Sequence, residues 1–273
     1  MSVTTWKTNW AIIDQSGDPQ RYVGVMAAIR KQHEEMEDIQ PFLRFCDLHV
    51  GERVLDVGSG PGWHVRVVSR IVGPTGRAVG VDLSEAMLAE ARQVAAARGV
   101  DVDFVHGSAY ALPFEPNSFD CCLSVGMTDI LEDPAHAVRE MVRVTRPGGR
   151  ICLAEHYNDG IFIGPSGTPL SKRLFAFVRE HEFTPPSGYE MMSILKSQGT
   201  TIEKVEGALQ HSDSSDFALG RTLFLEEWLA DAVAAGVLTS EEAQKWLADQ
   251  EAHAREGAFF FGYPVYLIKA TKQ

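Results

Sequence analysis

The sequence predicts an α/β fold with a parallel sheet covered by helices on both faces. From residue 53 to residue 156, short apolar runs of strand length alternate with stretches whose apolar residues recur at helical spacing. This alternation is typical of parallel sheets with helical crossovers. A loop with three glycines, at residues 58–62, follows the first run, and an acidic residue, Asp82, ends the second. Glycine loops between a strand and a helix are frequent nucleotide sites, so a ligand is expected at the carboxyl ends of these strands.

The first half of the predicted sheet has five strands, at 53–57, 77–81, 102–105, 119–125 and 150–155. A helix over 63–72 follows the glycine loop directly. Ser84 caps the next helix, which stops at Gly99, and Asp133-Pro134 opens another, because capping side chains mark helix starts and glycine marks helix ends. Before the sheet, Asp18-Pro19 is a similar start signal, and a second helix is expected over about 39–48.

The second half is less regular. Residues 157–186 are rich in glycine, proline and aromatic residues, which predicts a loop or lid over the site. Capping boxes at Ser187–Glu190 and Thr239–Glu242 predict two helix starts. The remaining expected elements are a strand at 201–209, helices at 215–235 and 240–256, and a last strand at 259–270. Pro264 lies inside that last strand, where proline suits a bulge or a locally unpaired position.

We expect one domain, because 273 residues with 45% hydrophobic content can bury a single core with insertions. Its expected parts are an N-terminal helical cap over 1–50, a ligand-binding core over 51–156, insertions on the substrate side over 157–257, and the last strand over 258–273.

The composition disfavours several partners. The net charge is −12 and no polybasic run occurs, which argues against nucleic acid or an anionic membrane. The four cysteines form no C-x-x-C pair, so neither a zinc nor a redox site is expected. No 18-residue apolar stretch and no signal-peptide core occur, so we expect a reduced, cytoplasmic protein. The sequence leaves open whether the protein forms a homo-oligomer.

The glycine spacing distinguishes between cofactors. Asp56, Gly58, Gly60 and Gly62 form the pattern D-x-G-x-G-x-G, whose third glycine comes one residue earlier than in the dinucleotide pattern. This pattern resembles motif I of the class I S-adenosylmethionine (SAM) methyltransferases. The resemblance extends over about residues 37–156.

Four elements in the family's order carry the resemblance: residues 54–62, 80–84, 107–114, and 119–120 running to 146–149. It is greatest to the branch that includes ubiquinone/menaquinone-biosynthesis methyltransferases and natural-product tailoring enzymes. It implies a Rossmann-like fold with a seven-stranded, mostly parallel sheet, an antiparallel last strand, N-terminal helices and helical lid insertions. It also implies SAM as the cofactor and a small molecule as the substrate.

The resemblance further implies cofactor contacts. Backbone around Gly58, Ser59 and Gly60 would approach the methionine part of SAM, Asp56 its ammonium group, and Asp82 the ribose hydroxyls. The remaining candidates are Leu83, Met87, Ser108 and Ala109 near adenine, Val125 beneath the sulfonium, and Tyr22 as a lid residue. Ser108 departs from the acid usual in the family. For Met87 and Tyr22, ordinary packing in the core is an alternative to cofactor binding. For Asp56, the alternative is a purely structural role in the loop.

Methyl transfer from SAM is an in-line displacement that needs positioning and exclusion of water. A general base is required only where the acceptor carries a proton of high pKa. His156 is the first candidate, because it follows the fifth strand. Glu155 and His211 are further candidates, and Asp129 is a candidate ligand for the substrate. The family often carries histidines where Asp129 and Ile130 stand, so a base is not carried over to that position.

The expected function is transfer of a methyl group to O, N or C of a small, largely hydrophobic molecule, in natural-product biosynthesis. Aromatic residues outside the core favour such a substrate. C-methylation of an isoprenoid alkene and a non-methylating cyclisation stay open as alternatives. An NAD-dependent oxidoreductase is disfavoured by the glycine spacing, and a protein or RNA methyltransferase by the absence of basic clusters.

Overall fold

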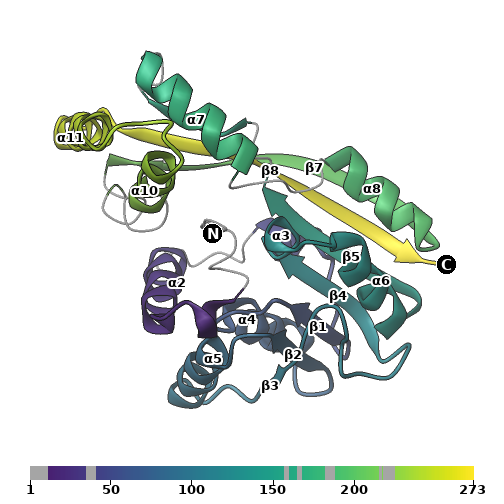
Figure 1. The fold of residues 1–273 in the computed structure, drawn as a ribbon. Helices are drawn as coiled ribbons and strands as arrows, with labels where there is room; N and C mark the ends of the chain where they lie inside the picture. Colours follow the sequence, from purple (N-terminus) through teal and green to yellow (C-terminus); the bar gives the residue numbers. More distant parts are fainter. Residues whose placement is uncertain are drawn as a thin grey trace.

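The computed structural model describes residues 12–34, 41–156, 160–164, 168–181, 188–214, 217 and 225–273. Its sheet has eight strands in the order β3-β2-β1-β4-β5-β8-β6, and β7 pairs with β8. The α/β fold predicted from the sequence is confirmed (Figure 1).

The first five strands are parallel to their neighbours: β1 (Arg53–Val57), β2 (Arg77–Asp82), β3 (Asp103–His106), β4 (Phe119–Val125) and β5 (Thr145–His156). The last strand, β8 (Phe260–Lys272), runs antiparallel to β5, to β6 (Phe162–Gly164) and to β7 (Thr200–Asp213). The expected count of seven strands is exceeded by the three-residue strand β6.

The predicted helix starts are confirmed where the structure describes them. Ser84 Oγ accepts a hydrogen bond from the Met87 amide, and Asp133 accepts one from the His136 amide. Thr239 forms a complete capping box at α11, whereas Ser187 lies outside the described residues. The helices are α2 (Pro19–Glu34), α3 (Pro41–Phe45), α4 (Trp63–Val72), α5 (Glu85–Ala97), α6 (Pro134–Val144), α7 (Pro169–His181), α8 (Gly188–Ser197), α10 (Glu226–Ala234) and α11 (Ser240–Arg255), with 3-10 turns η1 (Ile13–Gln15) and η2 (Thr128–Ile130).

Two apolar clusters cover the two faces of the parallel sheet. One joins the sheet to α6 and α8, through residues such as Met141 and Leu195. The other joins it to α3 and α4, through residues such as Phe42 and Val68. Because the helices bury both faces, the ends of the strands are where polar side chains and ligands can gather.

A separate apolar cluster lies beyond the parallel sheet. We use the term distal lobe for β6, α7, α10, α11 and residues 260–264 of β8, whose buried side chains share this cluster. Strand β8 extends past the end of β5, and the helices of the distal lobe gather around that extension (Figure 1). Pro264 lies between the residues that pair with β6 and those that pair with β5, so it has no partner on that edge of β8, but on the other edge it is in register with Leu209 of β7.

The expected loop over 157–186 is wrong for the described part of that range. Residues 169–181 form α7, and residues 162–164 form β6. Thr168 Oγ1 accepts a hydrogen bond from the Ser171 amide at 3.1 Å, so Thr168-Pro169 is a capped helix start. Leu174, Phe175 and Val178 then bury one face of the helix, which favours a helix over an open loop.

Among the described residues, no helix is long and apolar enough to cross a membrane. The same residues contain no cluster of His, Cys, Asp and Glu that could hold a metal ion.

Candidate cofactor and catalytic site

The glycine loop is held against β2 by its own amides. Gly58 N and Ser59 N both donate to the Val81 carbonyl, at 2.8 and 3.0 Å. Gly60 N donates to Asp82 Oδ2 at 2.8 Å. The three amides expected to face the methionine part of SAM therefore bond within the protein, and the loop offers a ligand its unhindered backbone surface.

The glycines of this loop have different tasks. Gly58 has a φ of 74°, and a Cβ there would lie 2.7 Å from Met127 Cγ, so only glycine fits. At Gly60 the nearest atom to a Cβ would be Met26 Cε, at 4.0 Å. Gly60 therefore faces open space between the loop and α2, and this is where a ligand can touch the backbone.

Beneath the loop lies a buried carboxylate. Asp56 is 2% exposed, and its Oδ2 has no hydrogen-bond partner in the described part of the chain. Ser59 Oγ, also buried, likewise lacks one. Burial, together with the charge of Asp82, raises the pKa of Asp56 to about 8. A cationic ligand that reached this group would restore its ionised form, and SAM, which carries an ammonium and a sulfonium, fits that requirement.

Asp82 ends β2 at the centre of the site. Its Oδ1 accepts a hydrogen bond from the Ser84 amide at 2.8 Å, and its Oδ2 accepts the Gly60 bond. Burial raises the pKa of Asp82, although these amide bonds oppose the effect. This one carboxylate therefore joins the glycine loop to Ser84, the residue that caps α5.

Asp14 was missed by the sequence analysis. It lies in η1, and it accepts hydrogen bonds from Ser84 Oγ at 2.6 Å and from the Glu85 amide at 2.7 Å. Burial opposes its ionisation, but these bonds hold the pKa of Asp14 below its usual value. The N-terminal segment is thereby docked on the first turn of α5. An acid 70 residues before its partner has no local signal.

The adenine-side candidates divide into two kinds. Leu83 is 52% exposed beside Asp82, so no core packing accounts for it. Met87 and Tyr22 are buried together in a small cluster between α5 and α2, which agrees with the packing alternative and also places Tyr22 beside the site. Ser108 and Ala109 follow Gly107, whose amide donates to the Asp82 carbonyl at 3.0 Å.

The catalytic candidates meet at the ends of β4 and β5. His156 Nδ1 forms a short hydrogen bond with Asp129 Oδ2, and Asp129, in η2, is 2% exposed. The imidazole is 30% exposed. It lies against the backbone of Gly126, directly after Val125, and its ring centroid is 4.9 Å from that of Tyr263. Nε2 forms no hydrogen bond with the described residues and is the nitrogen left for a ligand.

Glu155 is placed differently. It is fully buried. Burial, followed by the negative charge of Asp129, raises the pKa of Glu155 well above its usual value. The raised pKa favours the neutral form of this carboxyl. His211 lies on β7, where its ring stacks on Phe260, and it does not join this cluster. Of the three candidate bases, His156 is thus the one whose ring is partly exposed beside the ends of β4 and β5.

The comparisons with known proteins agree with this geometry. Residues 55–153 match a family model described as a methyltransferase domain. An uncharacterised 37.1 kDa protein in transposon Tn4556 of Streptomyces fradiae is 29% identical over 82% of this chain and 64% of its own length. The ubiquinone/menaquinone biosynthesis C-methyltransferase UbiE of Pseudomonas putida is 37% identical over 50% of this chain and 52% of its own length. The chain thus spans between half and two thirds of the length of these relatives.

Solved structures show the same fold. A putative methyltransferase from Bacillus halodurans matches with a TM-score of 0.59 at 21% identity, covering 85% of this chain and 96% of its own. The [4+2]-cyclase SpnF matches with a TM-score of 0.53 at 23% identity, covering 85% and 78%. The comparisons thus support a methyltransferase domain over residues 55–153 with SAM as its cofactor, and the solved structures show the fold class expected from the sequence.

Proposed function

We propose that this protein transfers the methyl group of SAM to a small, largely hydrophobic molecule, and that His156 removes a proton from the accepting atom. The observation that carries the proposal is the His156–Asp129 pair at the ends of β5 and β4, beside the glycine loop. Parallel α/β sheets bind their ligands at these strand ends, so the pair stands where an acceptor would meet the cofactor.

Each residue of the pair has a separate task. Asp129 accepts the Nδ1–H of the imidazole, which fixes the tautomer and leaves Nε2 as a proton acceptor. The burial of Glu155 favours its neutral form, which limits the negative charge behind Asp129. The edge contact with Tyr263 fixes the plane of the ring. SAM supplies an already activated methyl group, so the chain's contribution is to orient the acceptor, exclude water and accept one proton.

Two contacts support a hydrophobic acceptor, and the base itself fits an acceptor that carries a hydroxyl, amine or acidic carbon. Ile130, next to Asp129, packs against the apolar cluster of the distal lobe, and so does Tyr263. The base therefore lies at the border between a polar strand end and an apolar lobe. Small-molecule sites commonly combine apolar walls with a few placed polar groups. A role in natural-product biosynthesis is consistent with such a combination of apolar walls and polar groups.

The test measures release of S-adenosylhomocysteine with a panel of phenols, β-dicarbonyl compounds and amines. For an acceptor found in that panel, His156→Gln should lower kcat/KM by about 10²–10⁴-fold, the usual contribution of a general base. Binding of S-adenosylhomocysteine should change less than about twofold. His253→Gln, on α11, is the matched control. Turnover of His156→Gln within about twofold of wild type would remove the base from the proposal.

The same assay separates methyl transfer from the cyclisation alternative. A methyltransferase forms one S-adenosylhomocysteine for each methylated product, whereas a cyclase converts its substrate without consuming SAM. Product formation with no S-adenosylhomocysteine would overturn the proposed function.

A further inference from the structure

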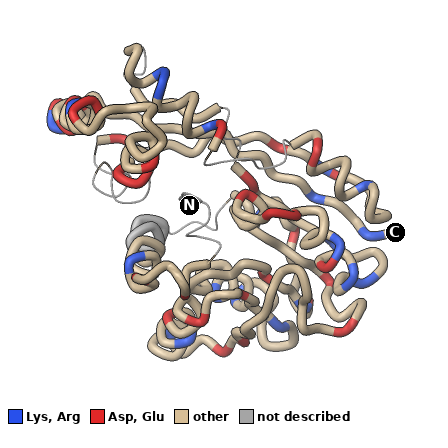
Figure 2. The backbone as a smooth tube through the Cα atoms, in the orientation of Figure 1, with Lys and Arg blue, Asp and Glu red and all other residues tan. Residues whose placement is uncertain are grey.

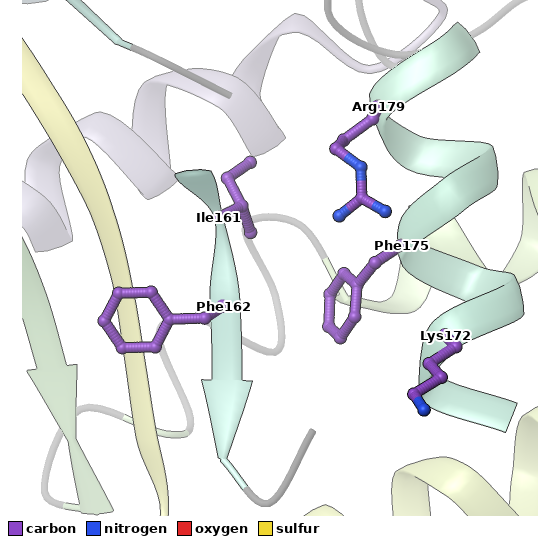
Figure 3. Close-up of a pocket in the computed structure, with 5 residues that line it drawn as sticks. All are labelled: Ile161, Phe162, Lys172, Phe175 and Arg179. Carbon is purple, nitrogen blue, oxygen red and sulfur yellow. The ribbon is translucent and has the colours of Figure 1, made fainter. Parts of the chain in front are cut away.

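A pocket of about 170 Å³ lies between α7 and β6, in the distal lobe. Ile161 and Phe162 line it from the β6 side, and Lys172, Phe175 and Arg179 line it from α7. Figure 3 shows the three α7 side chains extending toward β6 from successive turns of the helix. Residues spaced by three and four lie on one helical face, so this convergence is built into the sequence of α7.

The two cations of this pocket are uncompensated. In the part of the chain that the structure describes, neither Lys172 nor Arg179 forms an ion pair, whereas Arg173 pairs with Glu242 at 2.6 Å. Helix α7 carries three Lys and Arg and one acidic residue in a chain of net charge −12. The neighbouring helix α10 carries acidic residues and no Lys or Arg (Figure 2). A local positive site in an acidic protein attracts anions selectively.

The chemistry of the lining defines the ligand. A guanidinium matches the two oxygens of a carboxylate or phosphate, and an ammonium adds a second positive charge. The Phe175 ring and the Ile161 side chain provide apolar surface beside these charges, whereas the Phe162 ring points away from α7 and packs against Phe260 (Figure 3). The combination fits an oxyacid group attached to an aromatic or other apolar body, and it fits neither a free metal ion nor a neutral sugar.

The pocket is within reach of the catalytic pair. Phe162 pairs with Gly262 on β8, and His156 pairs with Val265 on the same strand. Three residues of strand separate the two positions, which is roughly 10 Å. Ile161 and Phe175 also belong to the apolar cluster against which Ile130 and Tyr263 pack. A molecule of two or three fused rings spans that distance.

We propose that this pocket binds a carboxylate or phosphate group of the methyl acceptor, so that the enzyme selects anionic apolar substrates and directs their far end toward His156. The inference rests on the proposed function. Lys172 and Arg179 bind the anionic group, and the side chains of Phe175 and Ile161 bind the adjoining apolar part.

The test compares three probes by fluorescence titration, with and without S-adenosylhomocysteine: 6-hydroxy-2-naphthoate, its neutral carboxamide, and 2-naphthyl phosphate. Wild type should bind one of the two anions at least about 10-fold more tightly than the carboxamide. Tighter binding of the naphthoate would indicate a carboxylate ligand, and tighter binding of the naphthyl phosphate would indicate a phosphate ligand. The double variant Lys172→Gln/Arg179→Gln should lose this preference. Arg173→Gln, on the same helix but ion-paired elsewhere, should keep it.

The outcomes are separable from those of the proposed function. Circular dichroism confirms that the variants fold, and a Lys172→Arg/Arg179→Lys variant should restore most of the preference because it keeps both charges. Equal binding of acid and amide by wild type, no binding of either anion at millimolar concentration, or a preference that survives the double glutamine variant would each overturn the inference. Loss of S-adenosylhomocysteine binding or turnover with the anion preference intact would instead count against the proposed function.

Discussion

Replacing Asp56 by asparagine tests the electrostatics of the cofactor site. Asp56 is buried beneath the glycine loop with one oxygen unpartnered among the described residues. Burial and the charge of Asp82 raise its pKa to about 8. In the unfolded chain the same carboxyl has its ordinary value near 3.8. Asparagine has the same shape and cannot ionise, so it removes the titration with little change in packing.

The direction of the pH dependence follows from the number of protons bound by the native and by the unfolded protein. Between about pH 5 and pH 7.5 the native protein holds one proton on Asp56 that the unfolded chain has released. The contribution of Asp56 to stability is therefore complete at a pH below its pKa in the unfolded chain. This contribution is lost as the pH rises toward 8. One proton corresponds to about 1.4 kcal/mol per pH unit, or roughly 3 kcal/mol between pH 5 and pH 7.

The assay is urea unfolding, followed by tryptophan fluorescence, at pH 5, 6 and 7. The free energy of unfolding of wild type should fall relative to that of Asp56→Asn by about 1.4 kcal/mol per pH unit. Asp101→Asn, an exposed residue, controls for the loss of one negative charge. Saturating SAM should flatten the wild-type slope, because its positive charge favours the ionised carboxylate. Parallel pH profiles of wild type and Asp56→Asn would refute the reasoning.

Two further substitutions probe the loop and the catalytic cluster. Gly58→Ala should lower the free energy of unfolding by about 1–3 kcal/mol in urea titration, because alanine strains a backbone with a φ of 74° and its Cβ meets Met127; a stability equal to wild type would contradict this account of the loop. Glu155→Gln should fold normally and keep methyl transfer within about 10-fold at pH 7, because burial favours the neutral carboxyl in the native protein. A collapse of turnover in Glu155→Gln, with His156 and Asp129 intact, would show that Glu155 must ionise.

Local signals explain which parts of the fold are predictable from the sequence. The strands from residue 53 to residue 156 and the caps at Ser84, Asp133 and Thr239 depend on residues close in the chain, and the structure confirms them. Helix α7 has such signals too, namely Thr168-Pro169 and apolar residues at helical spacing. The glycine, proline and aromatic content of 157–186 favours a loop, however, and these helix signals are short by comparison.

The site is predictable residue by residue but not as an arrangement. Asp129 and His156 are each expected near the substrate, yet their pairing joins residues 27 apart and depends on the parallel packing of β4 and β5. The engagement of the loop amides by β2 and the docking of Asp14 on α5 likewise depend on tertiary contacts. The pocket between α7 and β6 has no counterpart in the sequence analysis, because the sequence predicts a loop where α7 lies.

The measurement closest to the central claim is calorimetric titration of S-adenosylhomocysteine and SAM into wild type and Asp82→Ala. We expect one site per chain in wild type, and a loss of at least about 10-fold in affinity when the carboxylate at the end of β2 is removed. Asp101→Ala should bind as wild type does, and circular dichroism should show that all three proteins fold. Absence of binding to wild type, or equal affinity of folded Asp82→Ala, would contradict the assignment of this strand end as the cofactor site.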